Sequence, residues 1–166
     1  MSGGTDTFSS RQSNWQKLRS RMFHLFFLFQ RPMTLGVRAV VHDANAGTVF
    51  LVRHTYVSGW HLPGGGVEPG ESMVTSLERE LEEECNIELL APPELRSIHF
   101  NRQASRRDHV AVYLVTCFLQ TSERLRDHEI AEARFFPVGD LPDTTTPATR
   151  RRLAEMFENI PVGQDW

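Results

Sequence analysis

The stretch GGGVEPGESMVTSLERELEEECNIELL, residues 64–90, decides the fold of this chain, because the spacing of its apolar residues changes at Glu71. Upstream, apolar residues alternate with the period of two that is typical of strands; downstream, they recur with the period of a helix. One stripe of this helix carries four apolar side chains: Val74, Leu77, Leu81 and Cys85. The pattern predicts a helix from about Glu71 to Asn86, with Glu78 and Glu82 on the opposite, solvated face.

Carboxylates gather beside that stripe. Glu80, Glu83 and Glu84 lie on an adjacent sector of the helix, with the i, i+3 and i+4 spacing that makes side chains neighbours. Neighbouring carboxylates repel, so their proximity is unfavourable unless a cation neutralises it. Mg²⁺ prefers carboxylate and phosphate oxygens as ligands. The cluster therefore indicates a metal site, although a glutamate-rich helix surface taken alone is more often simply solvated.

Glycines precede the helix, at Gly64–Gly66 and again at Gly70. Glycine permits close backbone approach and positive φ, so amides of this loop can face phosphate oxygens beside a helix N-terminus. Glu71 and Arg79 supply an opposite-charge pair that can hold the loop against the helix. A phosphate-binding loop followed directly by a carboxylate helix is a specific combination, and it predicts a phosphorylated substrate.

These residues resemble the signature of the Nudix hydrolases, G-x5-E-x7-R-E-U-x-E-E-x-G-U, in which U is a bulky aliphatic residue. The matching positions are Gly65, Glu71, Arg79, Glu80, Leu81, Glu83, Glu84 and Ile87. Asn86 stands where the signature has its last glycine, and asparagine also tolerates the left-handed conformation of a helix C-cap. With similar flanking segments, WHLPGG at residues 60–65 and FFP at residues 135–137, the resemblance covers roughly residues 35–158.

The resemblance implies an α+β fold, the Nudix-type α/β/α sandwich with a mixed central sheet. It implies that water attacks a phosphorus of a nucleoside diphosphate linked to another moiety, with Mg²⁺ or Mn²⁺ as the cofactor. The metal ligands would be Glu80, Glu83, Glu84 and the carbonyl oxygen of Gly65. Glu71 and Arg79 would organise the site, and Glu83 or Glu84 would hold the nucleophilic water.

Residues outside the signature have two interpretations each. Arg53 is predicted to contact phosphate, or to form a salt bridge at the edge of the core. Trp60 is predicted to stack on a base, or to pack in the core, while the backbone at Gly65 and Gly66 approaches the substrate. Glu129 and Glu132 precede the last strand, and each is either an additional metal ligand or base, or a solvated charge.

Strands and a second helix are expected around this centre. The strands are predicted at residues 35–41, 48–54, 95–101, 110–119 and 133–138. A turn at residues 43–47 joins the first two into a hairpin. Thr146 is the predicted N-cap of a final helix that has Pro147 in its first turn and extends to about Glu158.

Composition limits the class of protein. The 166 residues are 40% hydrophobic and 23% charged, as in globular proteins, and a net charge of −3 provides no basic field for nucleic acid. No zinc-binding or disulfide spacing involves the two cysteines, Cys85 and Cys117, and their apolar neighbours indicate buried thiols. Two free thiols favour a reducing, cytoplasmic location.

Residues 1–32 are predicted to form an N-terminal extension, and residues 33–166 the Nudix domain. The extension contains an amphipathic helix with the apolar residues Trp15, Leu18, Met22, Leu25, Phe26 and Phe29. Its apolar segment is too short to span a bilayer, which takes about 20 residues. We expect the helix to pack on the domain or on a second copy of the chain in a homodimer; attachment to a membrane surface is the alternative.

The predicted function is hydrolysis of a diphosphate linkage in a nucleotide-type small molecule, with no nucleic-acid partner. Nucleotide sugars, ADP-ribose, dinucleoside polyphosphates and oxidised nucleoside triphosphates are not ranked, because specificity depends on loops outside the signature. The alternative is a non-catalytic nucleotide-binding regulatory module on the same fold. Retention of the mutually repelling Glu80, Glu83 and Glu84 argues against that module.

Overall fold

The computed structural model describes residues 33–166 and, upstream of them, Met22 alone. The predicted amphipathic helix of residues 1–32 and its packing therefore lie outside the described residues. Thr34–Trp166 form one compact unit. Among the described residues, every helix is too short or too polar to cross a membrane.

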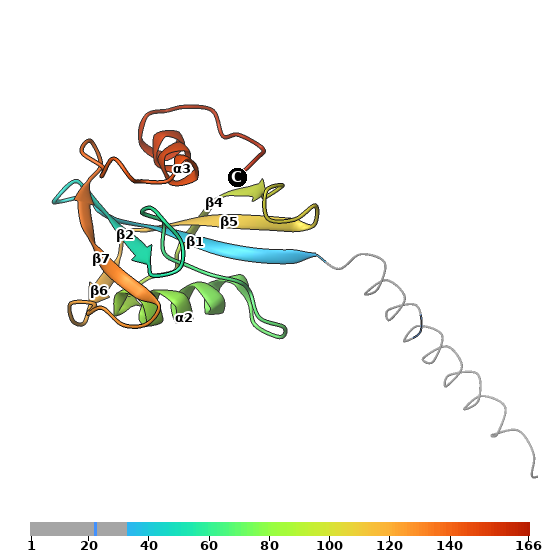
Figure 1. The fold of residues 1–166 in the computed structure, drawn as a ribbon, viewed down its shortest axis with the longest axis horizontal. Coiled ribbons are helices and arrows are strands. Elements are labelled where there is room, and N and C mark those ends of the chain that lie inside the picture. The colour runs from blue at the N-terminus through green and yellow to red at the C-terminus, as the bar shows by residue number, and fades with distance from the viewer. Residues whose placement is uncertain (1–21, 23–32) are drawn as a thin grey trace, which may run out of the picture. The chain divides into compact units, whose positions relative to one another are not determined.

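A five-stranded mixed sheet forms the middle layer (Figure 1). Its strands lie in the order β4 (Glu94–Phe100), β5 (Asp108–Val115), β1 (Thr34–Asp43), β2 (Thr48–His54) and β7 (Ile130–Pro137). Strands β1 and β5 are parallel, whereas the other neighbours are antiparallel. Helix α2 (Met73–Cys85) covers one face of the sheet and α3 (Pro147–Phe157) covers the other. The predicted α/β/α sandwich with a mixed central sheet is confirmed.

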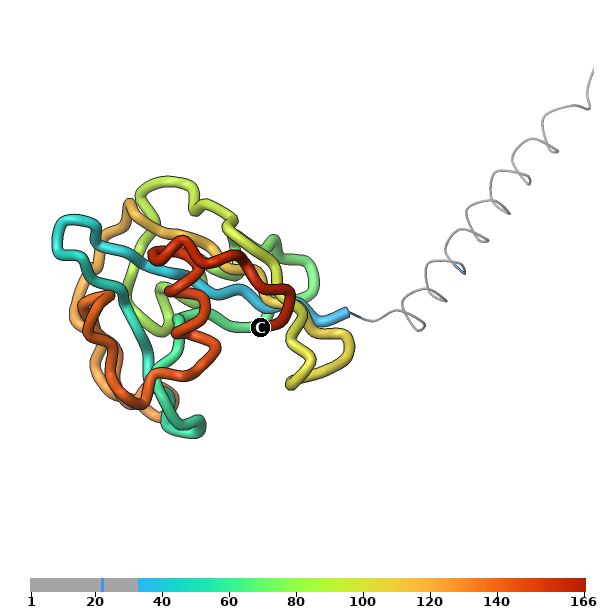
Figure 2. Tube along the Cα trace, turned by 90° about the horizontal axis from the view of Figure 1, so that it is seen from above, coloured from blue at the N-terminus to red at the C-terminus, as the bar shows by residue number. Residues whose placement is uncertain are grey.

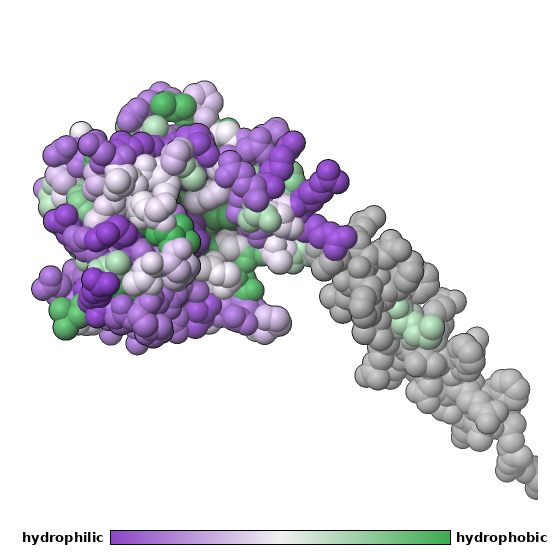
Figure 3. All heavy atoms as spheres, in the orientation of Figure 1, coloured by the Kyte–Doolittle hydropathy of each residue, from purple (hydrophilic) through white to green (hydrophobic). Residues whose placement is uncertain are grey.

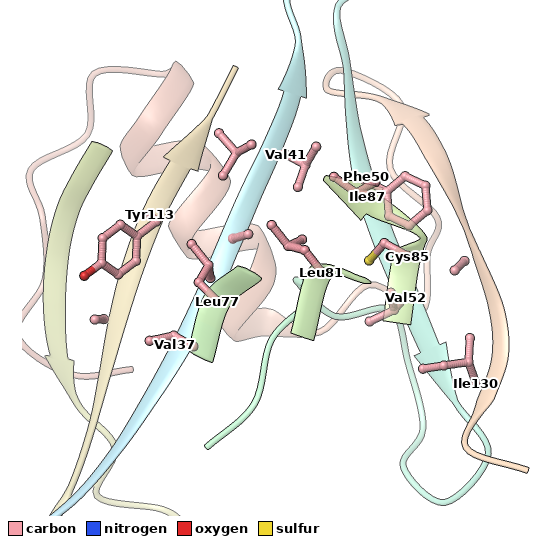
Figure 4. Packing of buried hydrophobic residues seen from close by; sticks show 14 residues of the cluster. Val37, Val41, Phe50, Val52, Leu77, Leu81, Cys85, Ile87, Tyr113 and Ile130 are labelled. Atoms are coloured by element: carbon pink, nitrogen blue, oxygen red, sulfur yellow. The ribbon is translucent and has the colours of Figure 1, made fainter. Parts of the chain in front are cut away.

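The two faces of the sheet have separate cores, because successive residues of a strand point to opposite faces. In β1, Val37 and Val41 face α2, whereas Val40 faces α3. The apolar stripe of α2 packs against β1, β2 and β5 (Figure 4), and its buried members are Leu77, Leu81 and Cys85. These are three of the four residues of the predicted stripe; the fourth, Val74, is half-buried and packs against the same core.

Charged residues cover the outside of this sandwich. Glu78 and Glu82 of α2 are exposed, as predicted for the face opposite the apolar stripe. Hydrophilic residues make up most of the surface in Figure 3, and apolar residues show only in small areas. The domain as a whole thus has the same arrangement as α2, with apolar residues inside and hydrophilic residues on the surface.

Strands β1 and β2 pair only near their turn, in two residue pairs. Beyond that point the predicted hairpin opens, and residues 60–67 run between the two strands. His61 exchanges two backbone hydrogen bonds with Val52, at 2.8 and 3.0 Å, and the Gly65 carbonyl accepts from the Val37 amide at 2.9 Å. The glycine loop is thus held inside the sheet layer, directly beside β1.

The predicted strand at residues 110–119 is wrong in one respect, because it is two strands. Strand β5 ends at Val115, and β6 (Phe118–Gln120) pairs with β3 (Ile87–Leu89) in a separate two-stranded sheet. A strand of three residues is too short to show a periodicity, so the sequence does not predict β3. The break also leaves Cys117 exposed, which corrects the expectation of two buried thiols; Cys85 is buried.

Helix α2 begins at a side chain that satisfies a free backbone amide, and it ends at a residue with a left-handed backbone. The Ser72 hydroxyl accepts from the Thr75 amide at 3.1 Å, and the C-cap Asn86 has a left-handed backbone with φ of 53°. The Asn86 side chain also donates to the Ser122 hydroxyl at 3.0 Å and to the Glu123 carbonyl at 3.2 Å. Asparagine therefore takes the backbone conformation of the signature glycine, as predicted, and adds contacts that glycine lacks.

Candidate active site

Gly64 connects the glycine loop to the last turn of α2. Its amide donates to Glu84 Oε2 at 2.8 Å. Its φ is +130°, and a Cβ at this position would lie 2.2 Å from the carbonyl oxygen of Val37. Only glycine fits such a position. The Gly64 backbone that requires glycine is also the backbone whose amide holds the Glu84 carboxylate.

The next glycine contacts a second carboxylate. A Cβ on Gly65 would lie 2.1 Å from Glu80 Oε1, so the Glu80 carboxylate fills the space that any other side chain would need. Burial raises the pKa of Glu80, against the opposing effect of its hydrogen bond from Arg79. Glu80 and Glu84, one turn apart on α2, are thus both fixed against neighbouring glycines.

Arg79 is the centre of the ion pairs at this site. Its guanidinium lies 3.1 Å from Glu71, 2.9 Å from Glu80 and 3.3 Å from Glu83, and it donates to the Gly66 carbonyl at 3.2 Å. The hydrogen bond between Arg79 and Glu71 is the main reason that the pKa of Arg79 is raised and that of Glu71 lowered. The predicted Glu71–Arg79 pair is present, and it clamps the loop to the helix.

Glu84 is the most deeply buried carboxylate of the cluster, with 5% of its surface exposed. Burial raises the pKa of Glu84 to about 7, although the hydrogen bond from the Gly64 amide opposes the shift. His54 Nε2 lies 3.6 Å from Glu84 Oε1. Burial, followed by the charges of His61 and Arg38, lowers the pKa of His54. Both groups are displaced toward their neutral forms, so the contact is weaker than a salt bridge between two full charges.

The raised pKa of Glu84 predicts a pH-dependent stability of the metal-free protein. Between its ordinary pKa of 4.5 and the folded-state pKa of about 7, the folded protein binds more protons than the unfolded chain. The contribution of Glu84 to the free energy of unfolding therefore falls as pH rises through this window, and it is fully present below pH 4.5. Glu84→Gln should remove this dependence and stabilise the protein by about 1–3 kcal/mol relative to wild type at pH 8, but not at pH 4.5.

Urea unfolding in EDTA at the two pH values measures this effect. Glu82→Gln, on the exposed face of the same helix, is the matched control and should show no such difference. An equal change of unfolding free energy in Glu84→Gln at both pH values would contradict the prediction.

Three residues of the site lie outside the signature and were not predicted from it: Arg38, His54 and Tyr56. His54 contacts Glu84, and the Tyr56 hydroxyl lies 3.4 Å from Glu129 Oε1. Arg38 is a cation within the run of residues 37–41, whose other members are apolar and buried, and this interruption of an apolar run is the signal that could have found it. His54 and Tyr56 follow Arg53 at the end of β2, and only the fold brings them to the carboxylates.

The structure gives the residues outside the signature distinct surroundings. Arg53 lies 2.8 Å from Glu132, which is the salt-bridge alternative. Trp60 is 4% exposed and packs edge-on against Phe136, with ring centroids 4.6 Å apart. Such burial favours packing in the core over stacking on a base. Glu129 is close enough for its charge to raise the pKa of Glu84, whereas Glu132 is held by Arg53.

The donor set has the chemistry of a site for a hard divalent cation. Its members are oxygens of Glu80, Glu83, Glu84 and Gly65, the type of ligand that Mg²⁺ takes. Glu83 is the outlier, since its side chain is 62% exposed. In the part of the chain that the structure describes, no three acidic, histidine or cysteine side chains converge on one point. The Arg79 guanidinium lies between Glu80 and Glu83, so metal binding would exchange its contacts for metal contacts.

Comparison with known proteins places this geometry in a family. The model of the NUDIX domain matches residues 32–157. Among solved structures, the MutT NUDIX hydrolase from Burkholderia pseudomallei is similar, with 27% identity, a TM-score of 0.62, and coverage of 72% of this chain and 95% of that chain. Comparison with curated proteins returned no match.

Two further structures are less identical and share the fold. A NUDIX hydrolase from Nitrosomonas europaea has 19% identity and a TM-score of 0.61, covering 80% of this chain and 98% of that chain. An ADP-ribose pyrophosphatase from Streptococcus suis has 21% identity and a TM-score of 0.55, covering 74% of this chain and 90% of that chain.

Fold and matches together define a hydrolase of the Nudix fold. The chain belongs to the NUDIX family, and it is a MutT-like Nudix hydrolase. The family inferred from residues 64–90 is confirmed.

Proposed function

We propose that this hydrolase requires Mg²⁺ or Mn²⁺ and cleaves the diphosphate of a nucleoside diphosphate linked to another moiety. The observation that carries the proposal is the anchoring of two carboxylates on one glycine loop: Glu84 on the Gly64 amide at 2.8 Å, and Glu80 against Gly65. Fixed carboxylate oxygens beside a glycine loop offer places for a cation and for the phosphate oxygens of a substrate.

The residues of the site then have separate roles. Glu80, Glu83, Glu84 and the Gly65 carbonyl would hold the cation, which when bound polarises the phosphoryl group and stabilises charge on the leaving phosphate. Glu84 is favoured over Glu83 for holding the nucleophilic water, because the Gly64 amide fixes the buried Glu84 carboxylate at 2.8 Å, whereas the Glu83 side chain is 62% exposed. Arg79 and Glu71 hold the glycine loop in position. The backbone of Gly66, within that loop, would approach the substrate.

Residues beyond the signature complete the proposal. Glu129 is favoured over Glu132 as a further carboxylate of the site, because Glu132 is engaged by Arg53 and by Arg134 at 2.9 Å. A nucleotide-type substrate is supported by the ADP-ribose pyrophosphatase among the structures of similar fold. We also propose a cytoplasmic location, on the two free thiols.

The test is hydrolysis of a substrate panel by the full chain. Nucleotide sugars, ADP-ribose, dinucleoside polyphosphates and oxidised nucleoside triphosphates are incubated with Mg²⁺ or Mn²⁺, and phosphate-containing products are measured. We expect turnover of at least one compound with metal and none in EDTA. Glu78→Gln, on the exposed face of α2, is the control that should turn over normally. No turnover of any compound by wild type would contradict the proposal and favour the non-catalytic binding module.

A further inference from the structure

The loop of residues 55–59 follows β2, and both of its ends are fixed by backbone hydrogen bonds. At its start, the Thr55 amide donates to the Glu129 carbonyl at 2.9 Å. Directly after it, the Trp60 amide donates to the Thr144 carbonyl at 3.1 Å. In Figure 2 this loop, drawn in blue-green, projects from the body of the domain. Its middle residues are therefore held out into solvent at a defined place.

Tyr56 is an exposed aromatic residue in this loop, and 67% of its surface is accessible. Every other phenylalanine, tyrosine or tryptophan among the described residues is buried or half-buried. The next residue, Val57, is also apolar and exposed. Single apolar residues on a surface are common and need no explanation. What gives this pair a meaning is its position relative to the carboxylates of the site.

The loop places Tyr56 at the edge of the carboxylate cluster. Its hydroxyl donates to Glu129 Oε1 at 3.4 Å. Its ring lies beside the His54 ring, with centroids 5.2 Å apart and an interplanar angle of 37°. His54 Nε2 in turn lies 3.6 Å from Glu84 Oε1. Tyr56 thus contacts the further carboxylate of the site, and one side chain separates it from the carboxylate that we assign to the nucleophilic water.

A tyrosine in this position offers the flat face of its ring to a substrate. Its hydroxyl is engaged by Glu129, so the ring is the part that remains free for a ligand. The ring is large and rigid, and it loses little conformational freedom when a ligand covers it. In a nucleotide only the ribose separates the base from the first phosphate. A base therefore lies within reach of Tyr56 when its phosphates lie at the carboxylates. Trp60, the aromatic residue that the sequence suggests for this role, is buried.

We propose that Tyr56 stacks on the base of the nucleotide substrate and is a specificity-determining residue of this enzyme. Val57 extends the apolar surface beside the ring. Because every base has an aromatic face, such stacking favours nucleotides over phosphorylated sugars without selecting one particular base. The inference rests on the proposed function, since it assigns a residue to the nucleoside part of the substrate of that reaction.

Binding of AMP and of ribose 5-phosphate tests the stacking, because these two compounds differ only by the base. Calorimetry with the full chain and Mg²⁺ gives a Kd for each. We expect wild type to bind AMP roughly 10–100-fold more tightly than ribose 5-phosphate, as for one stacked base. Tyr56→Ala should reduce this preference to less than about threefold, whereas Tyr56→Phe keeps the ring and should keep the preference within about twofold.

Steady-state kinetics on the best compound of the panel separate stacking from a role of the hydroxyl. A contact made equally in the ground state and the transition state affects KM alone, so Tyr56→Ala should raise KM about tenfold and leave kcat within about threefold. Tyr56→Phe should match wild type in both constants. Leu95→Ala is the matched control, because Leu95 is an exposed apolar residue on the edge strand β4, at the other side of the sheet from β2. It should leave both constants within about twofold of wild type.

The binding measurement does not depend on turnover, so it separates this inference from the proposed function. A preference for AMP that Tyr56→Ala abolishes, in a protein that hydrolyses no compound of the panel, would contradict the proposed function alone. Equal binding of AMP and ribose 5-phosphate by wild type would overturn the stacking. So would a Tyr56→Phe variant that loses the preference as fully as Tyr56→Ala does, because the hydroxyl and not the ring would then be the cause.

Discussion

Glu84→Gln is expected to lower kcat by roughly 10²–10⁴-fold, the range for loss of a group that accepts a proton in the reaction. The amide oxygen of glutamine can still accept the hydrogen bond that the Gly64 amide makes at 2.8 Å, so the loop keeps its place. What is lost is the negative charge and the ability to take a proton. Steady-state turnover of the best compound of the panel, with saturating Mg²⁺, measures the effect.

Variants along the same helix show whether the loss belongs to Glu84. Glu82→Gln removes a charge from the exposed face and should leave kcat within about twofold of wild type. Glu83→Gln loses an exposed carboxylate that lies 3.3 Å from Arg79, and it should lower turnover if Glu83 is a ligand or base. Full turnover by both Glu83→Gln and Glu84→Gln would show that neither residue holds the nucleophilic water.

Gly64→Ala is expected to destabilise the fold by about 3 kcal/mol or more, within the range known for strained or overpacked positions. The φ of +130° belongs to a region that side chains avoid, and the new Cβ would lie 2.2 Å from the Val37 carbonyl oxygen. That oxygen is backbone of the central strand and cannot move aside as a flexible side chain would. Urea or thermal unfolding measures the change.

Gly66→Ala is the matched control for Gly64→Ala. A Cβ on Gly66 would meet nothing within 4 Å, so this variant should stay within about 1 kcal/mol of wild type. The two substitutions add the same methyl group to one loop, two residues apart. Equal stability of the two variants would mean that the loop is not held against β1 in the way that the hydrogen bonds indicate.

The centre of the site was predictable because its interactions are close in sequence. The period of the apolar residues identifies the buried face of α2, and it assigns Glu78 and Glu82 to solvent. The Glu71–Arg79 pair and the left-handed Asn86 follow from the signature and from simple backbone rules, and the structure contains both. Each of these features depends on residues separated by about two helical turns or fewer.

Other features were not predictable, because they depend on which strands become neighbours. Residues 60–67 enter the gap between β1 and β2, and nothing in their local pattern specifies that position. The same arrangement buries Trp60 and turns Arg53 toward Glu132. It therefore favours core packing for Trp60 and a salt bridge for Arg53. The short strands β3 and β6 likewise exist only because they pair with each other.

The family, the carboxylate helix and the glycine loop follow from the amino-acid sequence alone, because spacing along one chain is enough to specify a helix face and a required glycine. The burial of Glu84 beside His54 and the unpaired Nη1 of Arg38 could be seen only in the folded chain. Burial and pairing are set by contacts between residues far apart in the chain, and the order of the strands creates those contacts.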